Sequence, residues 1–574
     1  MALFANLYVG SSGLRTAQNA LNTTAHNMAN IGTEGYTRQQ VTQGTQDYTT
    51  QKIDYKMIGP MQTGLGVVYN NTKQVRDMVL DRSFRLEGGR SAFYEVSYNT
   101  MAEIEDQLQE LNGAEFADTY DNLWTAIQEL SKDPTDATYQ AQFVNRANEF
   151  VVRGRAVYQG LQDYQNRMNN NVKDIVERIN KIGDEINALN KDISRIEGGK
   201  VEHANDLRDR RNALLDELSK YVNIEYAEDP LNVVQVSIEG TAFVMTDNVH
   251  HIGLDTADSC DHFYTPYWEF AAKQDERQAV DQYGNLQWDP PGDPTGTPVM
   301  EKYLNIDGAR VFDLRLQVSS AMRTDVGSLR STLLARGDHY ANYHDIADDQ
   351  TNAFYNKNIS QSIIMNIEAE FDMLFHNTCE AINEVMRNAQ SNPATIGTGA
   401  GKDTDTSDWV LFQVADPYLG LGYKIDDAHP AGSNRMGLSV TNTMINDALQ
   451  KDPTIFSFRT LTGDHDEAAM TAMKEAFSAA NYALNPNVAS KNSLRGYYSA
   501  LVTQIATSGS VYKGIMDFQQ LTVDNIASAR EEVHGVNQDE ELQFMIQFQN
   551  AFNASSRYIN VVSQMLDHLL NSLA

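Results

Sequence analysis

The segment GTGAGK at 397–402 comes closer than any other part of the chain to a phosphate-binding loop. In the pattern G-x-x-x-x-G-K-[ST], the glycines let backbone N–H groups approach a phosphate and the hydroxyl binds a magnesium ion. This chain has Ile396 where the first Gly is required and Asp403 where the hydroxyl is required. Because a carboxylate at that position would repel phosphate, we interpret the segment as a flexible loop.

A helical pattern over residues 358–388 places His376 and Cys379 on one face, near Asp372, and this set resembles a fragment of a metal site. A structural zinc site needs four ligands, and no second group of ligands accompanies these three. A histidine that packs in the core is the simpler interpretation. The acidic run at 345–349 lacks the Gly and the final Glu of a calcium loop.

No side chain stands as an activated nucleophile beside a base, so we assign no catalytic, cofactor-binding or metal-binding residue and expect no enzyme activity. The two cysteines, Cys260 and Cys379, lie far apart in the sequence. Two cysteines are too few for a disulfide scaffold. Cys379 has apolar neighbours and is expected to be buried, whereas Cys260 lies in a polar stretch, and we expect no bond between them.

The composition narrows the class of partner. The chain has 574 residues, too many for one hydrophobic core, and carries 45 basic against 77 acidic residues, a net charge of -32. Nucleic-acid binding requires clustered Lys and Arg, so this charge argues against a nucleic-acid partner. No run of 18 apolar residues is present, so we expect no membrane span. The first residues lack the basic and apolar regions of a cleavable signal.

Apolar residues recur every seven positions near both chain ends, which predicts helices that pack along their length. The N-terminal column consists of Leu7, Leu14, Leu21 and Met28. The C-terminal helix, starting near Leu542, carries one column of Met545, Phe552, Ile559, Leu566 and Leu573 and a second column of Phe548, Val562 and Leu569. Either the two ends pair within one chain, or they become ordered only when neighbouring copies bury them. Gly10, Ser11 and Gly13 weaken the first helix and favour the second alternative.

A second helical layer lies inside the ends. Apolar residues between Met168 and Ile196 alternate in steps of four and three, and helical patterns also cover 91–132, 137–167 and 205–221. Short β-like runs and turn residues dominate from about 224. We therefore expect a multidomain, mainly α protein with a coiled-coil-like core of terminal helices, a helical-bundle domain and inserted β-rich outer domains. The expected domains are a terminal core (1–60 with 525–574), a helical framework (61–223, 352–392 and 466–524), a β-rich insertion (224–351) and a loop-rich insertion (393–465).

The block AHNMANIGTEGYTRQQV, residues 25–41, follows the first predicted helix. Asn27 and Asn30 can end a helix and bond local backbone, Gly32 and Gly35 permit tight turns, and Tyr36 begins an extended stretch. This block resembles the N-terminal signature of flagellar rod, hook and hook-associated proteins.

The C-terminal block GVNQDEELQFMIQFQNAFNASSRYINVVSQMLDHLL, residues 535–570, resembles the hook-associated family that joins hook to filament. The matching residues are Gly535, Val536, Asn537, Asp539, Glu540, Glu541, Phe548, Gln549, Ala551, Ala554, Ser555 and Arg557. Residues 205–224 and the helix around 366–386 are also similar to that family. The resemblance is weak over 225–350 and 395–465.

The resemblance implies a secreted, extracellular subunit of the bacterial flagellum that passes unfolded through the type III export apparatus. It implies self-association in a helical or ring assembly through the terminal helices. The implied partners are the hook protein, the next hook-associated or filament junction protein, and an export chaperone at the C-terminal helix. The alternatives are another flagellar axial protein (hook or rod), an extracellular surface-binding protein, or a cytoplasmic coiled-coil scaffold.

Overall fold

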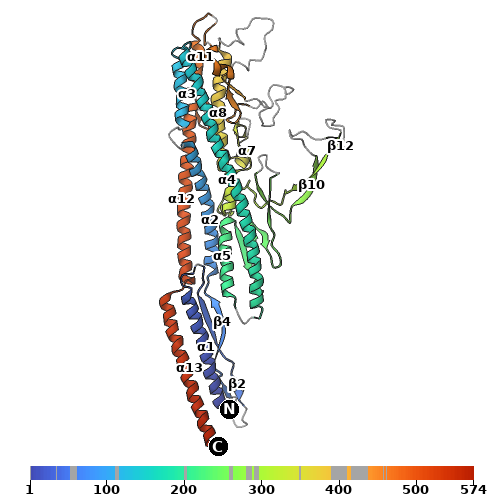
Figure 1. Ribbon diagram of the computed structural model, residues 1–574, viewed down its shortest axis with the longest axis vertical. Helices are drawn as coiled ribbons and strands as arrows, with labels where there is room; N and C mark the ends of the chain where they lie inside the picture. Colours follow the sequence, from blue (N-terminus) through green and yellow to red (C-terminus); the bar gives the residue numbers. More distant parts are fainter. Residues whose placement is uncertain are drawn as a thin grey trace. The chain divides into compact units, whose positions relative to one another are not determined.

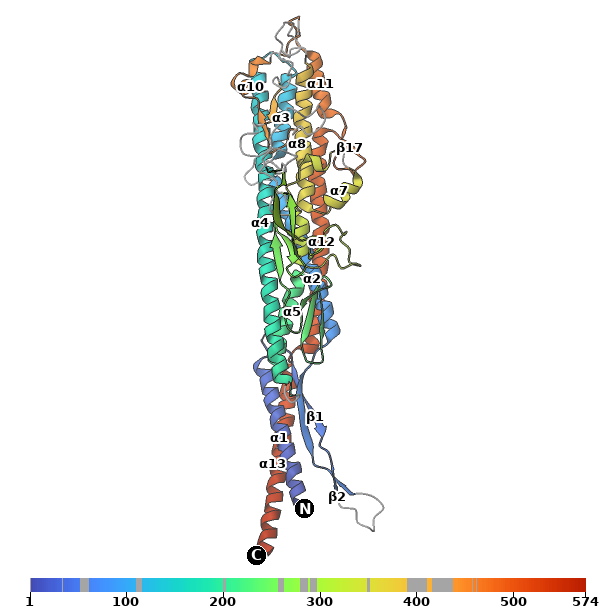
Figure 2. The same cartoon turned by 90° about the vertical axis from the view of Figure 1, so that its right-hand side faces the viewer.

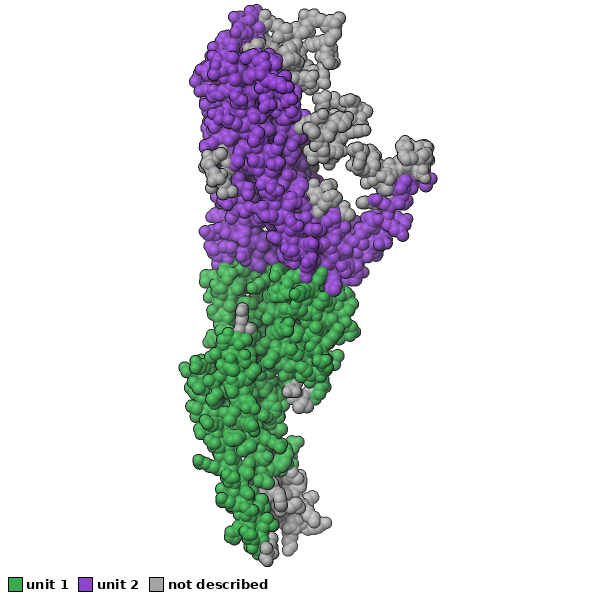
Figure 3. All heavy atoms as spheres, viewed as in Figure 1, with its two compact units in different colours: residues 1–91, 178–250, 518–574 green, residues 92–177, 251–517 purple. Residues whose placement is uncertain are grey.

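The structure is a computed structural model that describes residues 2–33, 35–51, 61–109, 116–199, 203–256, 263–278, 288–289, 297–347, 351–389, 410–414, 437–456, 458–460 and 462–573. The chain folds into two compact units, each built from separate stretches of sequence (Figure 3). Unit 1 contains Met1–Ser91, Arg178–His250 and Phe518–Ala574, and unit 2 contains Ala92–Glu177 and His251–Asp517. Long helices dominate both units, which confirms the predicted mainly α class (Figure 1).

Three long helices contribute residues to both units, namely α2 (Met78–Gln109), α4 (Ala137–Glu197) and α12 (Leu494–His534). The apolar repeat of α4 explains its length, since Met168, Val172 and Ile179 are buried and the repeat continues through Ile193. Ile196, the last predicted position of the repeat, is 41% exposed, one residue before the helix ends. No Pro or other chain break interrupts the helix between these points.

Unit 1 holds the two terminal helices, one further helix and three small antiparallel sheets. Its elements are α1 (Ala2–Ala29), β1 (Gln39–Thr45), β2 (Thr49–Gln51), β3 (Met61–Thr63), β4 (Val67–Gln74), α5 (Asn205–Tyr221), β5 (Ile224–Glu228), β6 (Val234–Ile238), β7 (Thr241–Val244) and α13 (Gln538–Leu573). Strand β1 pairs with β4, with a register shift between Thr42 and Gln43. The β5-β6-β7 sheet packs on α4, where Gly183 leaves room for the Phe243 ring.

Unit 2 is a helical bundle with short strands. Its elements are α3 (Phe116–Leu130), β8 (Ile252–Asp255), β9 (Thr265–Trp268), β10 (Lys273–Gln278), β11 (Trp288–Asp289), β12 (Thr297–Pro298), β13 (Met300–Asn305), α6 (Ser328–Arg336), η1 (Tyr343–Asp345), α7 (Asn352–Asn358), α8 (Ile363–Asn388), β14 (Phe412–Val414), β15 (Thr443–Ile445), α10 (Asp447–Lys451), η3 (Pro453–Ile455), α11 (Glu467–Ser478), β16 (Tyr482–Ala483) and β17 (Lys491–Asn492). Aromatic rings from α3, α4 and α8 form its centre, with the Phe150 and Phe375 centroids 4.8 Å apart.

The compact units are divided differently from the domains expected from composition. The strands of 224–244 belong to unit 1 with the terminal helices, whereas the strands from 252 onward belong to unit 2. Compact units and assembly domains need not coincide, so the expected domain scheme stays a prediction.

Candidate assembly interface

Helices α1 and α13, from opposite ends of the chain, pack along each other in unit 1 (Figure 2). Their closest approach lies at two glycines of α1. A Cβ added at Gly10 would stand 2.7 Å from Ile559 Cγ1, and one added at Gly13 would stand 2.8 Å from Ser555 Oγ. These glycines therefore set the distance between the two helices, a role that sequence reasoning missed when it counted them only as helix-weakening residues.

Small residues form the most buried stripe of α1. Gly10, Ala17, Ala20, Thr24 and Asn27 are buried and recur at helical spacing. The predicted column of Leu7, Leu14, Leu21 and Met28 is half-buried throughout. The tightest seam of α1 is therefore made by small side chains, and the larger predicted ones flank it.

The predicted stripe of α13 divides into three groups. Val562 is 2% exposed, and the half-buried members are Met545, Phe548, Phe552, Ile559 and Leu566. Leu542 and Leu569 are 39% and 44% exposed. The side chain of Leu573 lies outside the described residues. Most of the predicted stripe thus sits on the face of α13 that packs within the chain.

A second stripe of α13 is exposed in the chain. It consists of Ala551, Ala554, Tyr558, Val561, Met565 and Leu569, which follow one another in steps of three and four. Tyr558, Val561 and Met565 are 41%, 49% and 56% exposed. Val561, Met565 and Leu569 also line a shallow groove on the helix surface. Sequence reasoning assigned only Leu569 to the interface, because alanine and tyrosine give a weak apolar signal.

Asn27 joins the end of α1 to the strand that follows it. Its Nδ2 donates to the Gln39 carbonyl oxygen (2.8 Å), and its Oδ1 accepts from the Gln39 N–H (3.0 Å) and from the Tyr36 hydroxyl (2.8 Å). The Asn27 residue is 1% exposed, and Tyr36 is half-buried with its ring edge against His26. Burial, reinforced by nearby carboxylates, raises the pKa of Tyr36 above its ordinary value, so the hydroxyl stays protonated as a donor.

The other residues of the predicted turn have more local roles. Asn30 Nδ2 donates to the His26 carbonyl oxygen (3.0 Å), which caps the last turn of α1. Gly35 has a φ of 77°, in the left-handed region that favours glycine. A Cβ added at Gly32 would meet no atom within 4 Å, and Gly32 does not have such a φ, so its backbone does not require glycine.

The C-terminal signature meets this turn through Arg38. Its Nε donates to Glu541 Oε1 (2.9 Å), and its Nη1 lies 3.0 Å from Glu540 Oε2. Both carboxylates lie in the first turn of α13, where the helix dipole also favours negative charge. Asn537 starts this helix, because its Oδ1 accepts from the Asp539 N–H (3.0 Å). The signatures at the two chain ends are therefore bonded to each other.

The third family-like segment, in α5, meets the same turn through Asp209. Its Oδ1 accepts from Thr37 Oγ1 (2.6 Å) and from Gln74 Nε2 (2.7 Å), and its Oδ2 accepts from the Thr37 N–H (3.1 Å). Arg76 Nη1 lies 3.6 Å from this carboxylate. Burial outweighs these contacts and raises the pKa of Asp209 to about 6.

An ionic network holds α2, α5 and α12 together beside the turn. Asp81 pairs with Arg76 (3.0 Å) and Arg530 (2.8 Å), and Asp216 pairs with Arg530 (2.7 Å) and Arg85 (2.6 Å). Burial tends to raise the pKa of Asp81, but its arginine partners together hold it below the ordinary value. Removing one partner of such a network leaves a buried charge uncompensated.

His534 closes the network at the end of α12. Its Nε2 accepts from the Asp77 N–H (2.9 Å), and its carbonyl oxygen accepts from the Arg38 N–H (2.9 Å). Burial lowers the pKa of His534 to about 4, so the ring is neutral at pH 7, as an acceptor nitrogen requires.

The residues that resembled a metal site serve the core of unit 2. Asp372 accepts from the Tyr343 and Val440 N–H groups and from Ser439 Oγ, His376 Nδ1 bonds the Leu438 carbonyl oxygen at 2.8 Å, and Cys379 is buried as a free thiol. In the described ranges, no group of three or more His, Cys, Asp or Glu side chains could hold a metal ion. The segment 397–402 and Cys260 lie outside the described residues.

None of the helices in the described part of the chain is long and apolar enough to cross a membrane.

Three segments of the chain match known protein families. Residues 101–287 match the helical domain of the flagellar hook-associated protein FlgK. Residues 7–37 match the flagella basal body rod protein family, and residues 527–573 match the C-terminal family of the flagellar basal body rod FlgEFG proteins. The two terminal matches cover α1 with its turn and α13 with the end of α12.

Curated relatives match over nearly the whole chain. Flagellar hook-associated protein 1 of Bacillus subtilis (strain 168) is 23% identical over 574 residues, covering 99% of this chain and 98% of the relative. The Escherichia coli (strain K12) protein of the same name is 22% identical and covers 98% of each chain.

A solved structure shares the fold. The flagellar hook junction protein FlgK from Burkholderia pseudomallei superposes with a TM-score of 0.51 at 12% identity, covering 78% of this chain and 99% of that one. With the bonded terminal signatures, these matches confirm the resemblance seen in the sequence. The chain is therefore similar over nearly its whole length to flagellar hook-associated protein 1, and at its two ends to flagellar basal body rod proteins.

Proposed function

We propose that this chain is a structural subunit of the bacterial flagellum that forms the junction between hook and filament, and that it polymerises through its terminal helices after export. The observation that carries the proposal is the second apolar stripe of α13. The first stripe is packed against α1, but Tyr558, Val561 and Met565 are exposed in the single chain. An apolar helix stripe of this length needs a partner, and a neighbouring copy supplies one.

The order of the terminal helices depends on that partner. Helix α1 packs chiefly through small residues such as Gly10 and Ala17, which bury little apolar surface. Isolated helices with little buried surface are marginally stable in water. We therefore propose that α1 and α13 become fully ordered only when neighbouring subunits cover the second stripe, which leaves a flexible chain for passage through the export channel.

The partners follow from the position of a junction. We propose contacts with the hook protein on one side and with the next hook-associated or filament junction protein on the other, and an export chaperone on α13 before secretion. The protein then acts outside the cell. The Burkholderia pseudomallei neighbour is named a hook junction protein, which supports this placement. The net charge of -32 argues against a nucleic-acid partner.

We propose no enzyme activity, since the buried polar groups described above bond the structure itself. The nearest alternative is a hook or rod subunit, because the terminal families include basal body rod proteins. An extracellular surface-binding role is a weaker alternative, since it gives the second stripe of α13 no function.

The test compares substitutions on the two faces of α13 in the source bacterium. Val561→Asp places a charge in the exposed stripe without touching the α1 contact. Asn560→Asp adds the same charge at an exposed polar position and is the matched control. Ile559→Asp disrupts the contact with Gly10 inside the chain.

We expect Val561→Asp and Ile559→Asp cells to carry hooks without filaments, with flagellin lost to the medium, while Asn560→Asp cells swim normally. Electron microscopy scores hooks and filaments, and immunoblots of the medium confirm that each variant is exported. Normal filaments with Val561→Asp would refute the role of the second stripe. A strain lacking residues 535–574 that still builds filaments would refute the junction function, and a strain without hooks would identify an earlier axial component.

A further inference from the structure

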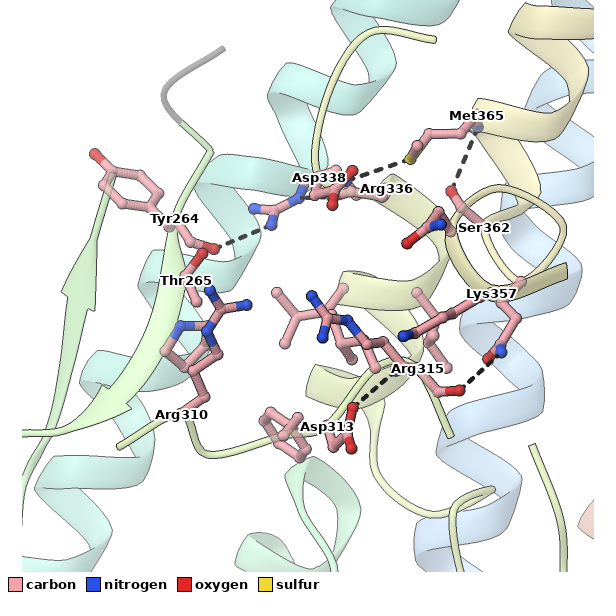
Figure 4. Close-up of a pocket in the computed structure, with 18 of the residues that line it drawn as sticks. Tyr264, Thr265, Arg310, Asp313, Arg315, Arg336, Asp338, Lys357, Ser362 and Met365 are labelled. Carbon is pink, nitrogen blue, oxygen red and sulfur yellow. Dashed lines mark hydrogen bonds between the residues drawn. The ribbon is translucent and has the colours of Figure 1, made fainter. Parts of the chain in front are cut away.

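Four basic side chains and three aspartates line a cleft in unit 2 of this strongly acidic chain (Figure 4). It lies between the loop after β13, helix α6 and helix α7, and has a volume of about 450 Å³. Arg310, Arg315 and Lys357 line it, and their nitrogen-bearing ends point toward its middle. The volume lies within the range of small-molecule sites.

Two of these cations make no ion pair with the described residues. Arg315 and Lys357 are exposed, and no carboxylate of the described chain lies within 4 Å of their charged groups. Arg310 lies 3.8 Å from Asp307, whose side chain is 84% exposed. Like charges that converge on one space repel each other unless an anion lies between them.

The wall of the cleft adds a buried positive charge. Arg336 is 2% exposed, and its guanidinium donates to the Tyr264 and Gly337 carbonyl oxygens (both 3.0 Å) and to Asn169 Oδ1. All three acceptors are neutral, so the guanidinium charge is not cancelled by its direct partners. Burial lowers the pKa of Arg336 to about 10, and the group remains charged at pH 7.

Three aspartates, Asp307, Asp313 and Asp338, also line the cleft. Asp313 Oδ1 accepts from the backbone N–H of Arg315 (3.0 Å), and Asp338 Oδ1 lies 2.7 Å from His339 Nδ1. Burial opposes charge on His339, but its two aspartate partners, Asp338 and Asp345, raise its pKa to about 10, so the ring is cationic at pH 7 and offsets part of their negative charge. The floor of the cleft is apolar and includes Met365 and Leu333.

We infer that this cleft is a binding site for a small organic anion, whose carboxylate or phosphate group is held by Arg310, Arg315 and Lys357 and whose body rests on the apolar floor. Arginine forks bind both groups through paired hydrogen bonds, and such charge-assisted bonds are stronger than neutral ones. None of the residues belongs to the terminal helices, so the site is independent of the assembly interface.

The binding test is calorimetry on the purified full chain at low salt with three probes: glucuronate, glucose 6-phosphate and glucose. We expect at least one charged sugar to bind and glucose to show no binding at the same concentration. Tighter binding of glucuronate would identify a carboxylate as the anionic group, and tighter binding of glucose 6-phosphate a phosphate. Equal behaviour of all three sugars would overturn the inference.

Variants locate the binding. Arg315→Gln with Lys357→Gln should weaken the charged sugar at least tenfold, because two of its charged partners are lost. Lys451→Gln with Lys491→Gln removes the same charge from exposed positions away from the cleft and should leave binding unchanged. If both double variants weaken binding equally, the effect is general electrostatics and the site is refuted.

A stability measurement makes the test independent of sugar chemistry. Sodium phosphate stabilises folded proteins in general more than sodium chloride does, so the two chains are compared. At equal ionic strength, the extra rise in unfolding temperature that phosphate gives should be smaller in Arg315→Gln with Lys357→Gln than in the wild type. An extra rise of equal size in both would contradict the site.

Discussion

Glu370 of α8 is a buried carboxylate without a cationic partner, and it should make the stability of unit 2 depend on pH. It is fully buried and accepts hydrogen bonds from Asn485 Nδ2 (2.7 Å), Gln504 Nε2 (2.9 Å) and Asn366 Nδ2 (3.2 Å). These donors are neutral amides, so burial dominates and raises the pKa of Glu370 from 4.5 to about 7. A carboxyl with a raised pKa holds its proton more tightly in the folded state than in the unfolded state.

The direction in which stability changes with pH follows from proton linkage. Between the two pKa values the folded chain binds more protons than the unfolded chain, so the free energy of unfolding falls as pH rises. With values of 4.5 and about 7, the loss between pH 5 and pH 8 is about 2.5 kcal/mol. Asp372, whose pKa burial raises to about 6, acts in the same direction at lower pH.

Glu370→Gln should remove this dependence, because the amide cannot ionise. Urea unfolding of the purified chain, followed by far-UV circular dichroism and Trp fluorescence at pH 5, 6.5 and 8, measures it. The difference in unfolding free energy between Glu370→Gln and wild type should shift in favour of the variant by about 2.5 kcal/mol from pH 5 to pH 8. Glu384→Gln, an exposed position of the same helix, should give a profile parallel to wild type. Parallel profiles for Glu370→Gln and wild type would refute the argument that Glu370 is protonated by burial.

Two further predictions concern the chain ends, and hydrogen exchange of backbone amides measures both. Gly10→Ala should destabilise the α1–α13 pairing by about 1 kcal/mol, because overpacking against Ile559 exceeds the gain in helix propensity. Gly88→Ala is the control: the added Cβ meets no atom within 4 Å, so this substitution should stabilise α2 by a similar amount. Slower exchange in α1 after Gly10→Ala would contradict the close approach. Asn27→Ala should speed hydrogen exchange of the Gln39 amide at least tenfold, because it removes the oxygen that accepts from this amide. Asn30→Ala, which removes a contact to His26, should leave exchange of the Gln39 amide unchanged. Equal effects of the two substitutions would show that Asn27 does not fix the start of β1.

The sequence predicted the long helices well because their signal is periodic and local. Residues Met168 to Ile193 follow a four-three alternation, and the repeat marks the buried face of α4 at nearly every step. Pro134 and the turn around it separate α3 from α4, between the helical patterns at 91–132 and 137–167. Such patterns report on the helix itself and need no knowledge of its partner.

The faces of the terminal helices were predicted less completely. The sequence predicts the leucine column as the packing face of α1, but the closest contacts with α13 are at Gly10 and Gly13, which have no apolar side chain to reveal them. In α13 the sequence predicts the column from Met545 to Leu573, but it does not predict the second stripe through Ala551 and Ala554. Small side chains form seams by allowing close approach, and hydrophobicity alone does not detect that property.

The ionic contacts could not be predicted from spacing. Arg38 and Glu541 are separated by almost the whole chain, and only the fold places them 2.9 Å apart. The motifs that contain them were recognised separately, as signatures of two chain ends. Likewise, Glu370 looks like any acidic residue on a helix, and its burial depends on amides from two other segments.

The two stripes of α13 restrict how subunits can associate. At about 100° per residue, the stripe through Ile559 and the stripe through Met565 lie roughly 120° apart around the helix. A helix with one apolar stripe needs only one partner to bury it, but in the α1–α13 pair the second stripe of α13 stays uncovered. Two such stripes packed against each other would close as a dimer. A head-to-tail contact, in which the stripe packs on a different face of the neighbour, leaves the neighbour's own stripe open. Such head-to-tail contacts cannot stop at a dimer, so association ends only when the circle of subunits closes or the helix they form is capped by a different protein.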